Sequence, residues 1–350
     1  MGRGASEHLN GALVSHLNSI HENFQILDQA PAFTLEKVEW KEVLEMGEQV
    51  SKQATIAGLL FTGDAPKSRE LEENMKVYFN LLQGFLLLSH GSQVGAGPTL
   101  SSSIHASVKP VVDCSFSFWK EAVTSFGSRH TDRKLSIPQL AGAVWQACDS
   151  LKKAPTTNYT AVGRAITKVA VSVKDVLREL KELKLEESSD QPPHNDDNSS
   201  EGDFGNDLSP DEMRIAQSAI DVVSSTLVII RELIRFITCL LKQKNPDNST
   251  QYVDSLEKLL KQCQGIGVQV DELGACLYPP QEVLAIKAAG AKICSEVHEV
   301  QAEVRSLDGS SESLFRGCET LDYSLKTLLS ELGSSDDNDL VPELQSLAVS

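Results

Sequence analysis

The sequence predicts an all-α protein, built as two antiparallel bundles of long helices joined by an acidic, disordered linker. Apolar residues recur at helical spacing in long segments on both sides of one acidic stretch. No run alternates with period two, and no strand–turn–helix unit occurs. The 350 residues suffice for two ordinary domains. We expect an N-terminal bundle of about six helices at residues 1–184, a linker at 185–209, and a C-terminal bundle of about four helices plus a short tail at 210–350.

Six apolar stripes with helical spacing precede the acidic stretch. Prolines mark several of their boundaries: Pro31 comes before the second segment, Pro66 opens the third and Pro110 bends the fourth. Thr34 is suited to cap the second helix, and the loop at residues 91–98 ends the third. The expected helical segments are 9–27, 34–61, 66–91, 100–126, 137–153 and 158–183.

The sharpest change in composition lies at residues 186–212, where ten acidic residues occur without a lysine or an arginine. Charge repulsion and scarce apolar residues keep such a segment unfolded. An exposed anionic coil can attract a basic partner, and phosphorylation of its serines would add charge. The alternative interpretation is a solvated tether. The candidate contact residues in this linker are Asp196, Asp197 and Asp203.

The C-terminal bundle is expected to begin at a capping box. Ser209 is a natural N-cap, Pro210 suits the first helical position, and Glu212 completes the box. The first helix then continues to a break at residues 245–246. Further helices are expected at residues 253–270, 283–304 and 314–332, with one or two extra turns at 340–347.

Leucines recur every seven residues in the last helical segment. Leu314, Leu321 and Leu328 are therefore candidate protein-contact residues, as in a leucine zipper. The companion positions are mixed, and residues 308–311 interrupt the helix. A buried stripe inside the bundle is the alternative interpretation.

We find no constellation of residues that predicts catalysis, a cofactor or a metal ion. The histidines do not occur as His-Glu-x-x-His or Glu-x-x-His, and no Cys-x-x-Cys pair is present. His298 is expected to be a solvated or locally paired imidazole. The chain is therefore predicted not to be an enzyme.

The charge balance bears on possible partners. With 49 acidic residues against 32 basic ones, the formal charge is −17, which disfavours direct binding of nucleic acid. Residues 1–6 fit a pattern for myristoylation of Gly2, but one acyl chain without a basic cluster gives no stable membrane anchoring. Seven scattered cysteines favour a reducing compartment. We expect the protein in the cytoplasm and nucleus.

Two short motifs carry a resemblance to a known family. Residues 271–280 end in Tyr278-Pro279-Pro280, and residues 144–148 read Val-Trp-Gln-Ala-Cys. They resemble the "D-L-…-Y-P-P" turn and the "V-W-x-A-C" helix of the cyclin-D-interacting proteins, also called GCIP, Maid or HHM, with Trp145, Tyr278, Pro279 and Pro280 as fold markers. The resemblance implies a two-bundle, non-enzymatic protein. It would bind D-type cyclins and helix-loop-helix factors and restrain cell-cycle progression or transcription.

Long helices with small residues would also suit a vinculin-like adaptor of the cytoskeleton or of adhesion sites. Ala54, Ala57, Ala289 and Gly290 are examples of such residues. For the first function, the expected mechanism is helix-in-groove recognition on an exposed face of the C-terminal bundle, with the acidic linker steering the encounter. Binding to a D-type cyclin would favour the first function, and co-sedimentation with actin the second.

Overall fold

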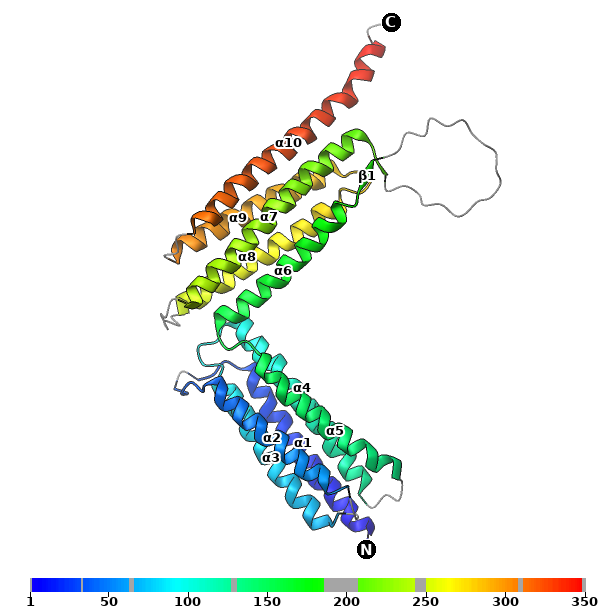
Figure 1. Cartoon of the computed structure of the whole chain (residues 1–350), viewed down its shortest axis with the longest axis vertical. Helices are drawn as coiled ribbons and strands as arrows, with labels where there is room; N and C mark the ends of the chain where they lie inside the picture. Colours follow the sequence, from blue (N-terminus) through cyan, green and yellow to red (C-terminus); the bar gives the residue numbers. More distant parts are fainter. Residues whose placement is uncertain are drawn as a thin grey trace, which may run out of the picture. The chain divides into compact units, whose positions relative to one another are not determined.

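The computed structural model describes residues 2–32, 34–62, 66–126, 131–185, 207–242, 250–307 and 311–347. Helices dominate these residues, which confirms the all-α class (Figure 1). In the described ranges the extended structure consists of two strands of two residues each, β1 (Lys184–Leu185) and β2 (Asp207–Leu208), which pair in parallel. The chain divides into two compact units, Met1–Ala161 and Val162–Ser350.

The first unit contains the helices α1 to α5 and two short 3₁₀ helices. Helix α2 runs antiparallel to α3, since Gln53 of α2 donates a hydrogen bond to Asn74 of α3 while Gly84 of α3 lies beside Met46. The described elements of this unit, before the first residues of α6, are α1 (Gly2–Gln25), η1 (Ile26–Asp28), α2 (Trp40–Leu59), α3 (Ser68–Gly91), α4 (Pro98–Ser125), α5 (Thr131–Ser150) and η2 (Leu151–Lys153).

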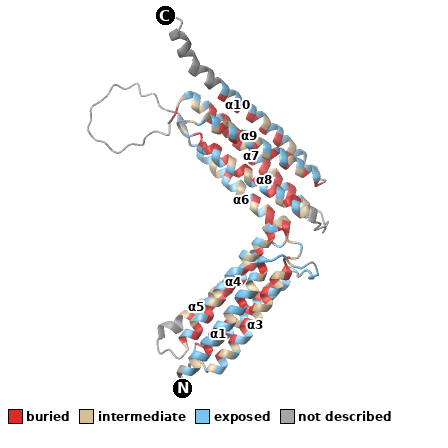
Figure 2. Ribbon diagram, turned by 180° about the vertical axis from the view of Figure 1, so that it is seen from behind, coloured by how far each residue is buried: buried red, intermediate tan, exposed pale blue. Residues whose placement is uncertain are grey.

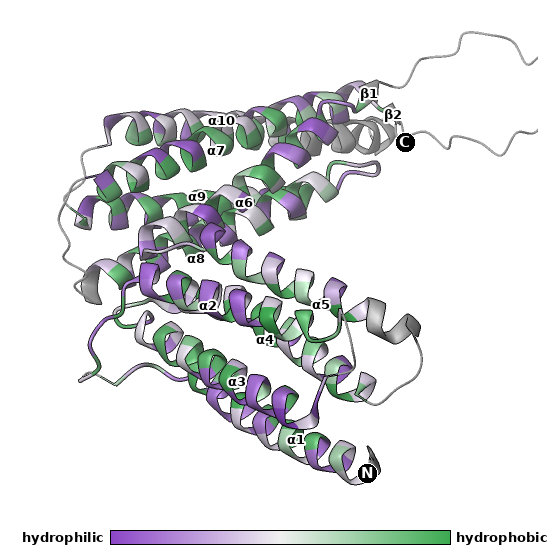
Figure 3. Ribbon diagram, turned by 60° about the horizontal axis from the view of Figure 1, so that its bottom comes forward, coloured by the Kyte–Doolittle hydropathy of each residue, from purple (hydrophilic) through white to green (hydrophobic). Residues whose placement is uncertain are grey.

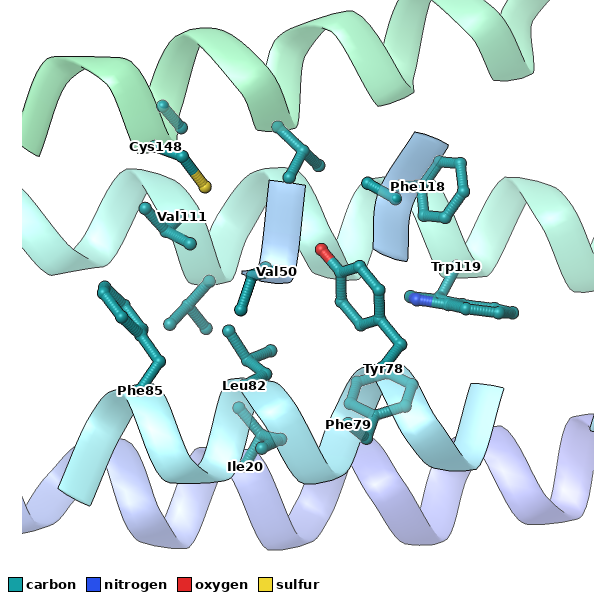
Figure 4. Packing of buried hydrophobic residues seen from close by; sticks show 14 of the residues in the cluster. Ile20, Val50, Tyr78, Phe79, Leu82, Phe85, Val111, Phe118, Trp119 and Cys148 are labelled. Atoms are coloured by element: carbon teal, nitrogen blue, oxygen red, sulfur yellow. The ribbon is translucent and has the colours of Figure 1, made fainter. Parts of the chain in front are cut away.

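A cluster of aromatic rings lies among the aliphatic side chains in the core of the first unit (Figure 4). Tyr78 packs edge-on against Trp119 with ring centroids 5.5 Å apart, and Phe118 meets the same indole at 5.4 Å. All three side chains are fully buried. Such pairs add to the hydrophobic stabilisation that their burial provides. The apolar stripes of α3 and α4 are thus joined through one ring cluster.

The second unit contains α7 to α10 and nearly all of α6. Helices α7 and α10 form an antiparallel pair, in which the hydroxyls of Ser225 and Ser324 lie 3.3 Å apart. Helices α8 and α9 form another, which Gln262 and Glu299 bridge through a 2.9 Å hydrogen bond. The helix bounds are α6 (Asn158–Leu180), α7 (Pro210–Lys242), α8 (Thr250–Ala275), α9 (Val283–Ser306) and α10 (Glu312–Leu347).

Helix α6 joins a different bundle from the one expected, because the sequence grouped residues 158–183 with the N-terminal helices. Its contacts run along α8: Val169 lies over Gly267, and Val176 lies over Gly274. The glycines let the two backbones approach, and buried residues recur along α6 beside α8 (Figure 2). The division between the units therefore lies within α6, before the acidic segment.

Two further helix boundaries test the sequence patterns. The capping box before α7 is present: the Ser209 N–H donates to the Glu212 carboxylate at 3.0 Å, and the Glu212 N–H donates to the Ser209 hydroxyl at 3.3 Å. Helix α10 is longer than expected, because its backbone stays helical through Leu347.

Hydrophobic residues form stripes along these helices (Figure 3). None of the described helices has both the length and the apolar character that a bilayer crossing requires.

Candidate interaction groove

A groove of about 430 Å³ lies between α9 and α10 in the second unit. Helix α9 contributes three small residues to its lining, and helix α10 contributes three leucines; other side chains of both helices complete it. The lining residues are Ile286, Lys287, Gly290, Ala291, Cys294 and His298 from α9, and Asp322, Leu325, Lys326, Leu328 and Leu329 from α10. The small residues at positions 290, 291 and 294 leave the space that larger side chains would fill.

Exposed leucines lie at the groove and near it on the surface of the second unit. Leu329 lines it and is 49% exposed, and Leu284 is 82% exposed one turn before Lys287 on α9. Gly290 brings the helices together at the floor, where an added β-carbon would lie 3.4 Å from Leu325. A surface with exposed leucines around a hollow is suited to receive an apolar helix from a partner.

Three potential metal ligands converge in the lining of this groove. The Cys294 sulfur lies 3.7 Å from Nδ1 of His298, one turn later on α9, and 3.9 Å from Oδ1 of Asp322 on α10. The three ligand atoms all lie within 4.8 Å of one another. Burial, together with the neighbouring Asp322 carboxylate, raises the pKa of the Cys294 thiol above its ordinary value.

The sequence predicted no metal site here, because this cluster contains no pair of histidines, no glutamate–histidine pair and no pair of cysteines. The available signal was the spacing of Cys294 and His298, four residues apart on one helix face. The third member could not be assigned from the sequence, since Asp322 comes from another helix.

Two family models match the chain. They describe "Grap2 and cyclin-D-interacting" proteins, with the N-terminal model on residues 42–186 and the C-terminal model on residues 193–302. The chain belongs to the Grap2 and cyclin-D-interacting (GCIP) family. The resemblance carried by the two motifs is thus confirmed.

Two relatives agree with this assignment to the GCIP family. One is a cyclin-D1-binding protein 1 homolog from Xenopus laevis, 23% identical over 274 residues, which are 76% of this chain and 80% of the relative. The other is cyclin-D1-binding protein 1 from Homo sapiens, 21% identical over 269 residues, with 73% and 72% covered. The names of the family and of these relatives describe binding proteins.

The GCIP motif residues occupy different environments. In the first motif, Trp145 is 45% exposed, whereas its neighbours Val144 and Cys148 are buried in the core of the first unit. In the second, Tyr278 is 37% exposed beside a hollow of about 300 Å³ between α6 and α8, and the peptide bond between Pro279 and Pro280 is cis. The Tyr-Pro-Pro segment thus forms the turn between α8 and α9.

The leucines expected to repeat as a zipper are interior residues of the bundle. Leu314 and Leu321 are fully buried, and Leu328 is 1% exposed at the floor of the groove. Their side chains pack between helices because α10 turns this stripe toward the rest of the unit. A partner could therefore contact Leu314 or Leu321 only if α10 moved. The other candidate contacts, Asp196, Asp197 and Asp203, lie outside the described residues.

Proposed function

We propose that this GCIP-family chain is a non-enzymatic regulator that binds a D-type cyclin or a helix-loop-helix factor and thereby restrains cell-cycle progression or transcription. Its groove between α9 and α10 would receive an apolar helix of the partner. The observation that carries the proposal is this groove, which has an apolar lining and an exposed leucine, Leu329, at its edge. The names of the two relatives supply the cyclin as a class of partner, and the resemblance of the two motifs supplies the helix-loop-helix factor.

The chemistry of the groove indicates which side chains a partner helix would present. Leu325, Leu328 and Leu329 favour a stripe of apolar side chains at helical spacing. Lys326 lines the same groove, so an acidic residue beside that stripe would be matched in charge. All seven cysteines of the chain are free thiols, which supports action in the reducing cytoplasm and nucleus.

The test is the affinity of the purified full chain for a purified D-type cyclin, measured by calorimetry beside a helix-loop-helix factor. We expect Leu329→Asp to weaken binding by about tenfold or more, because a carboxylate would enter an apolar contact. The matched control is Leu87→Asp, which alters an exposed leucine of similar exposure, 52%, on α3 of the other unit. Equal affinities of the two variants would exclude the groove between α9 and α10 as the binding site. Actin co-sedimentation without cyclin binding would favour the adaptor function instead.

The acidic linker has a separate role in this proposal. Its aspartates, among them Asp196, Asp197 and Asp203, would accelerate the encounter with a basic partner surface. Replacing these three by lysine should lower the association rate at low salt and leave the dissociation rate unchanged. Association rates equal to those of the unmodified chain would exclude steering by the linker. The proposal that the groove binds the partner would be unaffected.

A further inference from the structure

Cys294, His298 and Asp322 supply a sulfur, a nitrogen and an oxygen ligand to one point on the surface of the second unit. Residues four apart on a helix face the same side, so the backbone of α9 places Cys294 and His298 together. The antiparallel helix α10 then brings Asp322 to the same thiol, 3.9 Å away. Two helices are thus needed to build the cluster.

The separations from the Cys294 sulfur are close to those found around a tetrahedral metal ion. Zinc bonds of about 2.3 Å to sulfur and about 2.0–2.1 Å to nitrogen or oxygen place neighbouring ligand atoms about 3.5 Å apart. The observed separations are 3.7 Å from sulfur to the His298 nitrogen and 3.9 Å from sulfur to the Asp322 oxygen. All three ligand atoms lie within 4.8 Å of one another, so side-chain rotations would draw them together around the ion.

We propose that Cys294 Sγ, His298 Nδ1 and Asp322 Oδ1 form a Zn²⁺ site that joins α9 to α10. A thiolate and an imidazole select zinc over magnesium and calcium, which prefer oxygen ligands. On binding, the thiol releases its proton to solvent, and the thiolate and carboxylate together balance the two charges of the ion. The fourth position faces outward, because His298 is exposed, and is available to water.

The site would act on the groove that its three ligands help to line. Both helices that line the groove contribute ligands, so a bound ion would restrain the separation of α9 from α10 along the groove. This inference does not depend on the identity of the partner, since it rests on the three side chains alone.

The direct test is the absorption spectrum of the full chain with Co²⁺, followed by competition with Zn²⁺. We expect one Co²⁺ per chain, with the intense near-ultraviolet band of a thiolate ligand, displaced by one equivalent of Zn²⁺. Cys294→Ser should abolish that band and lower the zinc affinity by about tenfold or more. Asp322→Asn should lower the zinc affinity by a similar factor but keep the thiolate band. Cys239→Ser, which alters an exposed thiol on α7, is the control and should leave both unchanged.

A second measurement needs no variant and so is independent of folding defects. Zn²⁺ should protect Cys294 of the unmodified chain from alkylation, while the exposed thiol of Cys239 reacts at the same rate with and without the ion, as read by peptide mass spectrometry. Equal alkylation of Cys294 in both samples would overturn the proposal. It would also be overturned if the cobalt band survived in the Cys294→Ser chain.

Discussion

Val169 of α6 lies so close to Gly267 of α8 that a β-carbon added to the glycine would come within 2.9 Å of the valine Cγ1. Seven residues later on both helices, Val176 and Gly274 repeat the contact at the same distance. The two helices therefore run parallel, and the glycines allow valine side chains to reach the backbone of α8. This pair of contacts attaches α6 to the second unit.

Gly267→Ala should destabilise the second unit, although alanine normally favours a helix. An alanine in an open helical position gains about 1 kcal/mol over glycine, whereas a crowded β-carbon costs about 1–3 kcal/mol. The matched control is Gly333→Ala in α10, where an added β-carbon meets nothing within 4 Å. Urea unfolding followed by circular dichroism measures both. If Gly267→Ala stabilised the chain as much as the control, the close contact with α6 would be excluded.

Tyr78→Phe should cost the first unit about 1 kcal/mol of unfolding free energy, the usual net value of one hydrogen bond. The tyrosine hydroxyl lies 2.6 Å from the hydroxyl of Ser115, which also donates to the Val111 carbonyl and so keeps a partner in the variant. Thermal unfolding measures the loss. Ser115→Ala in the same background should add less than it does alone, and strict additivity of the two changes would argue against the pair.

The contribution of Tyr78 should also depend on pH in one direction. Burial raises the pKa of Tyr78 well above its usual range, so the folded state holds the proton more tightly than the unfolded chain. The associated stability is therefore fully present below about pH 10 and is lost as the pH rises further. Unfolding of the Tyr78→Phe variant should lack this alkaline dependence.

The capping box of α7 should give an acid-dependent contribution. Partial burial raises the pKa of Glu212, but hydrogen bonds from the Ser209 N–H, the Ser209 hydroxyl and the Gln281 N–H outweigh it and leave the pKa below its ordinary value. The stability that this carboxylate adds is present above the ordinary glutamate pKa and is lost as the pH falls through the lower folded value.

The comparison of the unmodified chain with Glu212→Gln measures this effect. Their difference in unfolding free energy should be constant near neutrality and should shrink below about pH 4.5. Ser209→Ala, which removes the cap itself, should cost about 1 kcal/mol at neutral pH. A difference that grew on acidification would contradict the assignment.

Leu321→Ala should destabilise the second unit by about 2–5 kcal/mol, because its side chain is fully buried. Leu329→Ala, at the half-exposed edge of the groove, should change the stability by less than about 1 kcal/mol. Denaturant unfolding of both variants distinguishes the stability contribution of the buried leucines of α10 from that of its exposed leucine. A small loss of unfolding free energy in Leu321→Ala would favour Leu321 as a surface residue that contacts a partner.

The sequence could predict much of the fold because the apolar spacing of each helix is local. It also located the capping box at Ser209 and Glu212, where the side chains lie three residues apart. It could not assign the α9–α10 groove, because a groove depends on which small residues of one helix face which leucines of another. Gly290 and Leu325 meet only in the folded unit.

The family and the helical character of this chain were determined by its residues alone, through the periodic stripes and the two motifs around Trp145 and Tyr278. The partner of α6 and the meeting of Cys294 with Asp322 were decided by the tertiary structure. A stripe specifies which face of a helix is buried, but many other apolar faces could cover it. The choice among them depends on how closely two particular backbones can approach, as Gly267 and Gly274 allow here.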